Sequence, residues 1–220
     1  MRYFDLSHPV VHGMISCPGL PGPVVDAHLS REASRGRYAP GTEFHIGRIT
    51  MIGNTGTYID APFHRHADGA DLADLPLERL ADLPVTLVRR APDAPRAIGP
   101  EALQGLPLAG RAVLVHTGHA RRWGDDAYFR DLPHLTRGAA ELLCAAGAAL
   151  AGIDAMNIDS TADPERPVHT LLLGAGLPIV ENLTGLDALP EPCPGLRFFA
   201  VPAPVRALGS LPVRAFALAP

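Results

Sequence analysis

The sequence predicts a mixed α/β (α+β) fold in a single domain spanning residues 1–220. The chain is long enough for one sizeable core, and 47% apolar with 19% charged residues is a globular composition. Short apolar runs typical of strands outnumber the helical patterns. These strands and helices do not alternate strictly, which favours a mixed sheet over a doubly wound parallel one.

The first half of the chain is expected to be mostly strands and loops. A proline- and glycine-rich loop runs to Pro23, and a flexible connection at residues 33–41 could lie over the functional site. Short helical turns are expected at residues 69–80, interrupted by Pro76, and at residues 98–103. Strands are expected at residues 3–6, 24–34, 44–52 and 83–88.

The second half contains the clearest helix, at residues 136–149. Thr136 is a suitable N-cap, Leu142 and Leu143 belong to an apolar stripe, and Gly147 ends the helix. Strands are expected at residues 111–117, from 152 onward, and at 178–181, 196–201 and 213–218.

Charge and composition exclude several classes of partner. The net charge is −4, all 19 basic residues are arginines, and no basic block indicates a nucleic-acid surface. The N-terminus lacks a signal segment, and no apolar run approaches a membrane span. The three cysteines, Cys17, Cys144 and Cys193, have no metal spacing and are expected to be reduced thiols. We therefore expect a cytoplasmic protein that binds neither nucleic acid nor membranes.

Residues 53–66 are the most informative stretch. A Gly-Asn-Thr-Gly turn, whose glycines permit close approach of backbone to a ligand, is followed by Tyr58, Asp60, His64 and His66. Pro62 fixes the backbone between Asp60 and His64. A carboxylate and an imidazole at this spacing are typical of a metal site or an acid–base pair.

This stretch resembles the signature of the cyclase family, which includes bacterial kynurenine formamidase and isatin hydrolase. The family pattern is His-x-Gly-Thr-His-x-Asp-x-Pro-x-His, and Asn54 and Tyr58 stand where two metal-binding histidines occur in typical members. The likeness runs from Asp5 to about Ala217. It is carried by Gly56-Thr57-x-x-Asp60-x-Pro62-x-His64, Gly152-Ile153-Asp154, His169, Glu181-Asn182-Leu183 and Gly209-Ser210-x-Pro212.

The resemblance implies a cyclase-like swivelling β/β/α fold, a homodimer or homotetramer, and specific roles for residues. His64 is expected to be the acid–base group, and Asp60, His169 and Glu181 the metal ligands. Neutral Tyr58 is expected to donate to an oxyanion. Asn54, Thr57, Phe63 and His119 are expected to contact the substrate.

The two replacements reduce the expected metal content to one weakly held divalent ion, Mn²⁺, Zn²⁺ or Mg²⁺, or to none. Two carboxylates and one imidazole favour Mn²⁺ or Mg²⁺ over tightly held Zn²⁺.

Three functions remain open at this point. The first is a hydrolase of a small amide, formamide or lactam, with activated water and His64 as acid–base group. The second is a metal-free cyclase, dehydratase or isomerase of a small carbonyl compound, using His64, Glu181 and Tyr58. The third is a non-catalytic relative that binds a small molecule.

Overall fold

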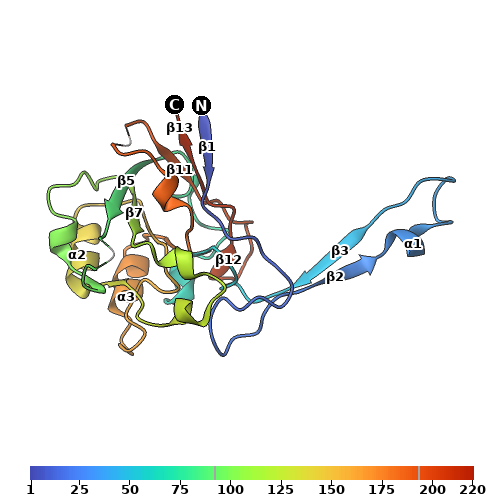
Figure 1. Cartoon of the computed structure of the whole chain (residues 1–220), viewed down its shortest axis with the longest axis horizontal. Helices are drawn as coiled ribbons and strands as arrows, with labels where there is room; N and C mark the ends of the chain where they lie inside the picture. Colours follow the sequence, from blue (N-terminus) through green and yellow to red (C-terminus); the bar gives the residue numbers. More distant parts are fainter. Residues whose placement is uncertain (92, 193) are drawn as a thin grey trace.

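A mixed β-sheet forms the centre of the body (Figure 1). The computed structural model describes residues 1–91, 93–192 and 194–220, so the expected thiol of Cys193 lies outside the described residues. Among these residues the sheet has nine strands. In spatial order they are β1 (Arg2–Asp5), β13 (Phe216–Ala219), β11 (Arg197–Phe199), β5 (Leu83–Arg89), β7 (Ala112–His116), β9 (Leu150–Ile153), β10 (Ile179–Glu181), β4 (Tyr58–Asp60) and β12 (Ser210–Pro212).

The middle of the sheet is parallel and its flanks are antiparallel. Strands β5, β7, β9 and β10 run parallel, whereas β4, β12, β11, β13 and β1 join in antiparallel pairs. The apolar sequence of β7 suits a position buried on both faces. Val113 and Val115 belong to one core cluster, and Leu114 belongs to the other.

Two helices pack on the cluster that contains Val113. They are α2 (Arg137–Ala145) and α3 (Pro167–Gly174), which contact each other. Thr136 caps α2 as predicted, since its hydroxyl accepts the Ala139 N–H at 3.4 Å. Short elements complete the body: η1 (Pro62–His64), η2 (Leu77–Arg79), η3 (Pro100–Ala102), η4 (His119–Arg122), η5 (Asp126–Phe129), η6 (Leu186–Ala188), β6 (Ala97–Ile98) and β8 (His134–Leu135).

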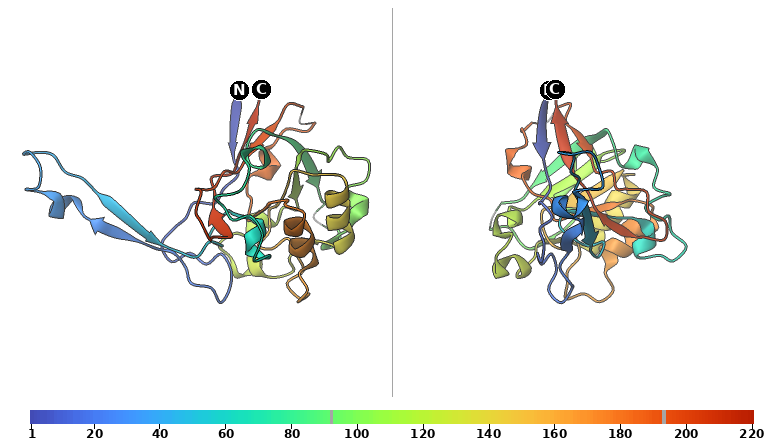
Figure 2. Two further views of the ribbon diagram at one scale, coloured as in Figure 1. Left: turned by 180° about the vertical axis from the view of Figure 1, so that it is seen from behind. Right: turned by 90° about the vertical axis from the view of Figure 1, so that its right-hand side faces the viewer.

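An antiparallel hairpin projects from this body as an arm (Figures 1 and 2). It consists of β2 (Val24–Leu29), α1 (Arg31–Ser34) and β3 (Ile46–Thr50). The expectation that residues 33–41 lie over the functional site is wrong for a single chain, because this connection forms the end of the arm. The strand expected at residues 24–34 ends at Leu29, because Ser30 caps α1 through the Ala33 N–H.

The mixed fold class predicted from the sequence is confirmed, but three elements differ. The strand expected at 213–218 begins only at Phe216, as β13, and the separate strand β12 at Ser210–Pro212 was not expected. No element is expected at Tyr58–Asp60, where the structure has β4, because a strand of three residues is too short to show alternation. Helix α3 was missed because its apolar residues form a continuous run rather than a stripe, although Pro167 at its first position is a start signal.

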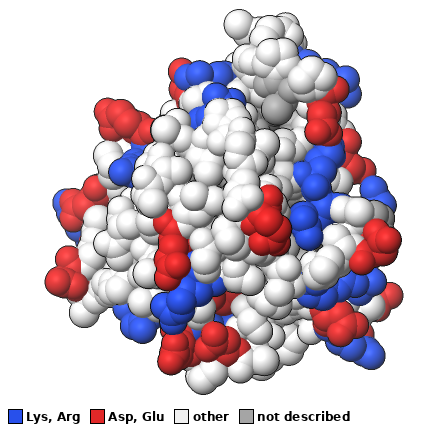
Figure 3. Space-filling model, turned by 90° about the vertical axis from the view of Figure 1, so that its left-hand side faces the viewer, with Lys and Arg blue, Asp and Glu red and all other residues white. Residues whose placement is uncertain are grey.

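Both chain termini lie on the compact body, and charged side chains cover the face of the body opposite the arm. The two termini lie together because β1 pairs with β13 (Figure 2). Charged side chains of both signs are interspersed over the face that points away from the arm (Figure 3). Within the described ranges, no helix has the length and apolar character required to cross a bilayer.

Candidate active site

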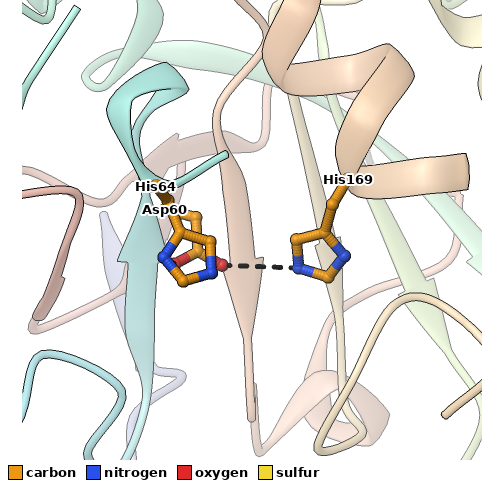
Figure 4. A group of neighbouring side chains, drawn as sticks. All are labelled: Asp60, His64 and His169. Atoms are coloured by element: carbon orange, nitrogen blue, oxygen red, sulfur yellow. Dashed lines mark ion pairs between the residues drawn. The ribbon is translucent and has the colours of Figure 1, made fainter. Parts of the chain in front are cut away.

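Four elements bring the predicted site residues to one place. Antiparallel pairing of β4 with β10 sets Tyr58 opposite Glu181, and Asp60 ends β4. The η1 turn begins at Pro62 and carries His64, while α3 carries His169. Figure 4 shows the His64 and His169 rings facing the same space, with the Asp60 carboxylate beside them.

Asp60 is fully buried, and only one of its two carboxylate oxygens accepts a hydrogen bond among the described residues. Its Oδ1 atom accepts the Ser210 hydroxyl at 2.5 Å. Its Oδ2 atom is buried without a hydrogen-bond partner among the described residues, and lies 3.7 Å from His169 Nε2 (dashed line in Figure 4). A buried carboxylate oxygen without a donor is costly, which favours a cation at this position.

Asp159 holds the His169 ring in place. Its Oδ2 atom accepts His169 Nδ1–H at 2.7 Å, and the same carboxylate accepts the backbone N–H groups of Val168 and His169 at 2.8 Å. Nε2 therefore faces the centre. Burial by itself lowers the pKa of His169, but the carboxylates of Asp159, Asp60 and Glu181 raise it to about 10.

Glu181 is completely buried beside His169. Its Oε1 atom accepts the Ile158 N–H at 2.6 Å and lies 3.4 Å from His169 Nε2, while Oε2 accepts the Tyr58 hydroxyl. Burial raises the pKa of Glu181 to about 7, and burial together with the nearby carboxylates raises that of Tyr58. The Asn54 side chain lies within hydrogen-bond reach of the Tyr58 hydroxyl, which itself donates to Glu181.

His64 is the accessible member of the group, with 36% of its side chain exposed. Its Nδ1 atom lies 2.9 Å from Ser210 Oγ. Because Ser210 has one hydroxyl proton and gives it to Asp60, His64 Nδ1 must be the donor to Ser210. The lone pair of His64 is therefore on Nε2, where it can take a proton or bind a cation.

These side chains can hold one cation. Asp60, His64 and His169 each offer a ligand atom, and the three atoms lie within 4.8 Å of one another. Glu181 Oε1 lies 3.4 Å from His169 Nε2 and accepts the Ile158 N–H, and a carboxylate oxygen has a second lone pair that can bind a cation. The Asp60 carboxylate and the two imidazoles, with or without the Glu181 carboxylate, form a donor set that suits Mn²⁺ or Zn²⁺.

A pocket of about 250 Å³ opens onto the centre and carries two arginines. It is lined by His64, Arg65, Asn157, Arg166 and His169. Arg166 precedes α3 with a φ of +47°, and its guanidinium donates to the Ser160 carbonyl at 3.2 Å. Arg65 donates to Thr170 Oγ1 at 3.1 Å. The mouth of the site is therefore positively charged.

Near Glu181 lies an aromatic group. The His8 ring stacks on Trp123 at 3.9 Å between centroids, and Trp123 meets the edge of Tyr128. The Tyr128 hydroxyl donates to Asn182 at 2.7 Å. Cys17 packs against the same group, and burial followed by the charge of Glu181 raises the pKa of its thiol. A neutral thiol is a poor nucleophile.

The residues expected to contact substrate divide into two kinds. Thr57 and His119 are buried: the Thr57 hydroxyl donates to the Asn182 carbonyl at 2.6 Å, and the His119 ring bonds the Tyr128 carbonyl at 2.8 Å. Both side chains are therefore engaged in hydrogen bonds to the backbone. Asn54 and Phe63 are half-buried, and Phe63 lies in η1 next to His64.

Three residues with clear contacts at the centre had no assigned role in the sequence reasoning. They are Ser210, Asp159 and Arg166. The Ser210 contacts with Asp60 and His64 join residues about 150 positions apart, and no local pattern reveals them. Asp159 follows the Gly152-Ile153-Asp154 stretch and precedes His169 by ten residues. An acidic residue shortly before a histidine is a pattern that could have indicated their pairing.

Comparison with known proteins gives consistent matches. Residues 4–160 match the family model named Cyclase. A kynurenine formamidase of Bacillus cytotoxicus is 30% identical over 217 residues, covering 97% of this chain and 96% of that protein. Isatin hydrolase A from Labrenzia aggregata superposes with a TM-score of 0.81 at 23% identity, covering 98% and 93% of the two chains. A structure described as a potential metal-dependent hydrolase with cyclase activity has a TM-score of 0.76 at 24% identity, covering 98% and 96%.

Proposed function

The chain belongs to the cyclase family, and from this premise we propose that it hydrolyses the C–N bond of a small amide, formamide or lactam. One observation carries the proposal. A buried carboxylate oxygen of Asp60 without a hydrogen-bond partner among the described residues faces His169 Nε2, beside the accessible His64. Kynurenine formamidase, the name of the matched relatives, is a hydrolase of this type.

Asp60, His169 and Glu181 would hold one divalent cation. Their facing atoms are separated by 3.7 Å and 3.4 Å around His169 Nε2, and these separations suit ligands of one ion. When bound, such an ion supplies Lewis-acid polarisation of a carbonyl and acidification of water. Asp159 fixes the His169 tautomer that presents Nε2.

His64 would act as the acid–base group. Its Nδ1–H donates to Ser210, which donates to Asp60, so the ring is oriented and Nε2 is free to accept a proton. The same nitrogen can return the proton to the leaving amine. Exposure of the ring lets it reach both substrate and solvent.

The mouth of the pocket favours an acidic substrate. Arg65 and Arg166 line it together with His64, and guanidinium groups bind carboxylates well. The stacked His8 and Trp123 rings on the side of Glu181 would suit an aromatic group. We therefore favour an aryl formamide that carries a carboxylate.

The assay is hydrolysis of an aryl formamide that carries a carboxylate, measured as release of formate. Wild type should turn it over, and His64→Ala should lose about 10²–10⁴-fold in kcat. His66→Ala is the matched control, since His66 lies two residues away and bonds the Thr170 carbonyl at 3.1 Å. An active His64→Ala enzyme would refute the acid–base assignment.

The metal content of the His64→Ala variant distinguishes two possible roles of His64, proton transfer and cation binding. If His64→Ala retains the cation but not the activity, His64 transfers protons. If it loses the cation, His64 is the third ligand of the Asp60–His64–His169 group.

A second candidate is acid–base chemistry without a metal, such as cyclisation or dehydration of a carbonyl compound. It is favoured by His169, whose raised pKa of about 10 puts a positive charge between Asp60 and Glu181 without any ion. Turnover that survives exhaustive chelation would support this candidate over hydrolysis assisted by a cation.

A further inference from the structure

Asp154 is a buried carboxylate at the carboxyl edge of the parallel strands, and the proposed reaction gives it no role. It directly follows β9, and its N–H donates to the Val115 carbonyl of β7 at 3.3 Å. Only 1% of its surface is exposed. Glu181 ends β10, which runs parallel to β9, so Asp154 and Glu181 lie at the same edge of the sheet. Asp154 itself lies outside the group that could hold a cation.

Three donors of one turn converge on the Asp154 carboxylate. Its Oδ1 atom accepts the backbone N–H and the hydroxyl of Thr117 at 2.8 and 2.6 Å, and Oδ2 accepts the Gly118 N–H at 2.8 Å. Gly118 has a φ of +76°, a conformation that favours glycine, and leads the chain from β7 into η4. An ionised carboxylate has only acceptors and therefore suits three donors, whereas an amide would bring an N–H group against one of them.

From Thr117, hydrogen bonds continue into the aromatic residues that follow. We name His119, Trp123 and Tyr128 the aromatic wall. The Thr117 hydroxyl oxygen accepts the His119 N–H at 3.2 Å, and His119 Nε2–H donates to the Tyr128 carbonyl at 2.8 Å. A path of hydrogen bonds therefore leads from Asp154 to the far end of the aromatic wall.

The far end of the aromatic wall is bonded to the centre of the site. The Tyr128 hydroxyl donates to Asn182 Oδ1 at 2.7 Å, and Asn182 directly follows Glu181. The Asn182 amide donates to the Gly56 carbonyl at 2.7 Å, in the turn before β4. The wall is therefore fixed at one end by Asp154 and at the other by Asn182.

Trp123 owes its position to packing within this frame. Its ring meets the edge of Tyr128, with centroids 5.0 Å apart, and stacks on His8 with an interplanar angle of 6°. Trp123 is half-buried, so part of its ring surface is open. Because aromatic pairs depend on offset and angle, a shift of the turn at Thr117 and Gly118 changes what this surface can bind.

We propose that Asp154 is a positioning residue that holds the aromatic wall in place for the ring of an aromatic substrate. The inference rests on the proposed function in one respect, namely that the substrate carries a ring. Asp154 sets the affinity for that ring and takes no part in the proton transfers at His64. Because the wall contacts the ring equally before and during the reaction, its loss affects KM rather than kcat.

The first test is a comparison of two substrates. Asp154→Asn should raise KM for the aryl formamide about tenfold, because it replaces an acceptor by a donor within the turn. It should change kcat by less than about twofold, and KM for N-methylformamide, which has no ring, should stay that of wild type. His116 Nε2 lies 4.0 Å from Asp154 Oδ2. A fall in kcat with unchanged KM would therefore overturn the proposal in favour of proton transfer by this pair.

A pair of variants at Thr117 guards against a folding defect in Asp154→Asn. Thr117→Val keeps the shape but removes the hydroxyl that donates to Asp154 and accepts from His119. It should raise KM for the aryl formamide as Asp154→Asn does. Thr117→Ser restores the hydroxyl and should restore KM. Equal KM values for Thr117→Val and Thr117→Ser would overturn the proposal.

The fluorescence of Trp123 tests the wall without any turnover, because it is the only tryptophan of the chain. Benzoate should change the emission of wild type, and Asp154→Asn and Thr117→Val should need about tenfold more benzoate for the same change. Wild-type emission that benzoate leaves unchanged, or equal benzoate affinity in all three proteins, would overturn the proposal. A wild type that binds benzoate in this way but hydrolyses no formamide would support the positioning role and refute the proposed hydrolysis.

Discussion

Asp159 shows how a residue outside the centre decides what the centre can bind. Its carboxylate accepts two hydrogen bonds from His169, one from the backbone N–H and one from Nδ1–H, and a third from the Val168 N–H. Of the two ring nitrogens, only Nε2 remains to face the centre. Asp159→Asn should weaken divalent-cation affinity about 10–100-fold, as loss of such an orienting partner does. Calorimetric titration with Mn²⁺ or Zn²⁺ measures this.

Asp163→Asn is the matched control for Asp159. Asp163 lies four residues along the chain and only caps a local turn through Glu165 N–H at 2.9 Å. Equal cation affinity in the two variants would show that Asp159 has no orienting role.

Arg166 gives a prediction about substrate selectivity at the mouth of the pocket. Arg166→Gln should raise KM about tenfold for a formamide that carries a carboxylate, because a charge-assisted hydrogen bond is lost. KM for neutral formanilide should be unchanged. Arg137→Gln, an exposed arginine paired with Glu165, is the control. Equal changes in KM for both substrates would mean that Arg166 does not bind the substrate carboxylate.

Among single residues, the sequence predicted the titratable groups that meet at the centre better than the residues that contact and orient them. Asp60, His64, His169 and Glu181 were expected, because their residue types and their likeness to a known family are local properties, and their roles remain proposals. Ser210 could not be found in this way. Its hydroxyl becomes relevant only when β12 pairs with β4 and sets Ser210 opposite Asp60.

The pairing of β4 with β12 also fixes the position of His64. A Cβ atom at Gly209 would lie 2.6 Å from the His64 backbone, and Gly209 cannot retreat because its carbonyl accepts the Ala61 N–H at 2.7 Å. Gly209→Ala should therefore displace η1. We expect a loss of about 1–3 kcal/mol in unfolding free energy and up to about 10²-fold in kcat.

Gly138→Ala provides the comparison for Gly209. Gly138 lies in the first turn of α2, where a Cβ atom meets only Pro100 at 3.5 Å, so this change should leave activity intact. Denaturation curves and steady-state kinetics on both variants would decide the matter. A fully active Gly209→Ala enzyme would contradict the proposed close packing of η1 on Gly209.

Elements with a strong local signal were predicted, and short ones were not. Helix α2 was found because Thr136 and Gly147 mark its ends, and β7 because it is a continuous apolar run. Strand β4 has three residues and α3 has eight, too few to show a period. The arm was misread because alternation predicts a strand but not which surface it packs on.

At the scale of the whole molecule, the free energy of unfolding depends on pH, and His8 contributes to this dependence. Burial lowers the pKa of His8 to about 4, against about 6.5 in the unfolded chain. Between these values the unfolded chain binds a proton that the folded chain does not, so stability falls as the pH drops from about 6.5 to about 4.

His8→Phe should keep the stacking on Trp123 and remove this proton uptake. Urea midpoints at neutral and acidic pH should then fall less for the variant than for wild type. Parallel falls in the two proteins would mean that other groups control acid unfolding.

The central claim is that Asp60, His169 and Glu181 hold one divalent cation for amide hydrolysis. It is tested most directly by elemental analysis of protein at dialysis equilibrium with Mn²⁺ or with Zn²⁺, with the dialysis buffer as the blank. We predict about one ion per chain in wild type and almost none in Asp60→Asn, which retains the shape but not the charge of the carboxylate. Wild-type protein free of metal in both preparations, or an Asp60→Asn variant that retains it, would contradict the account.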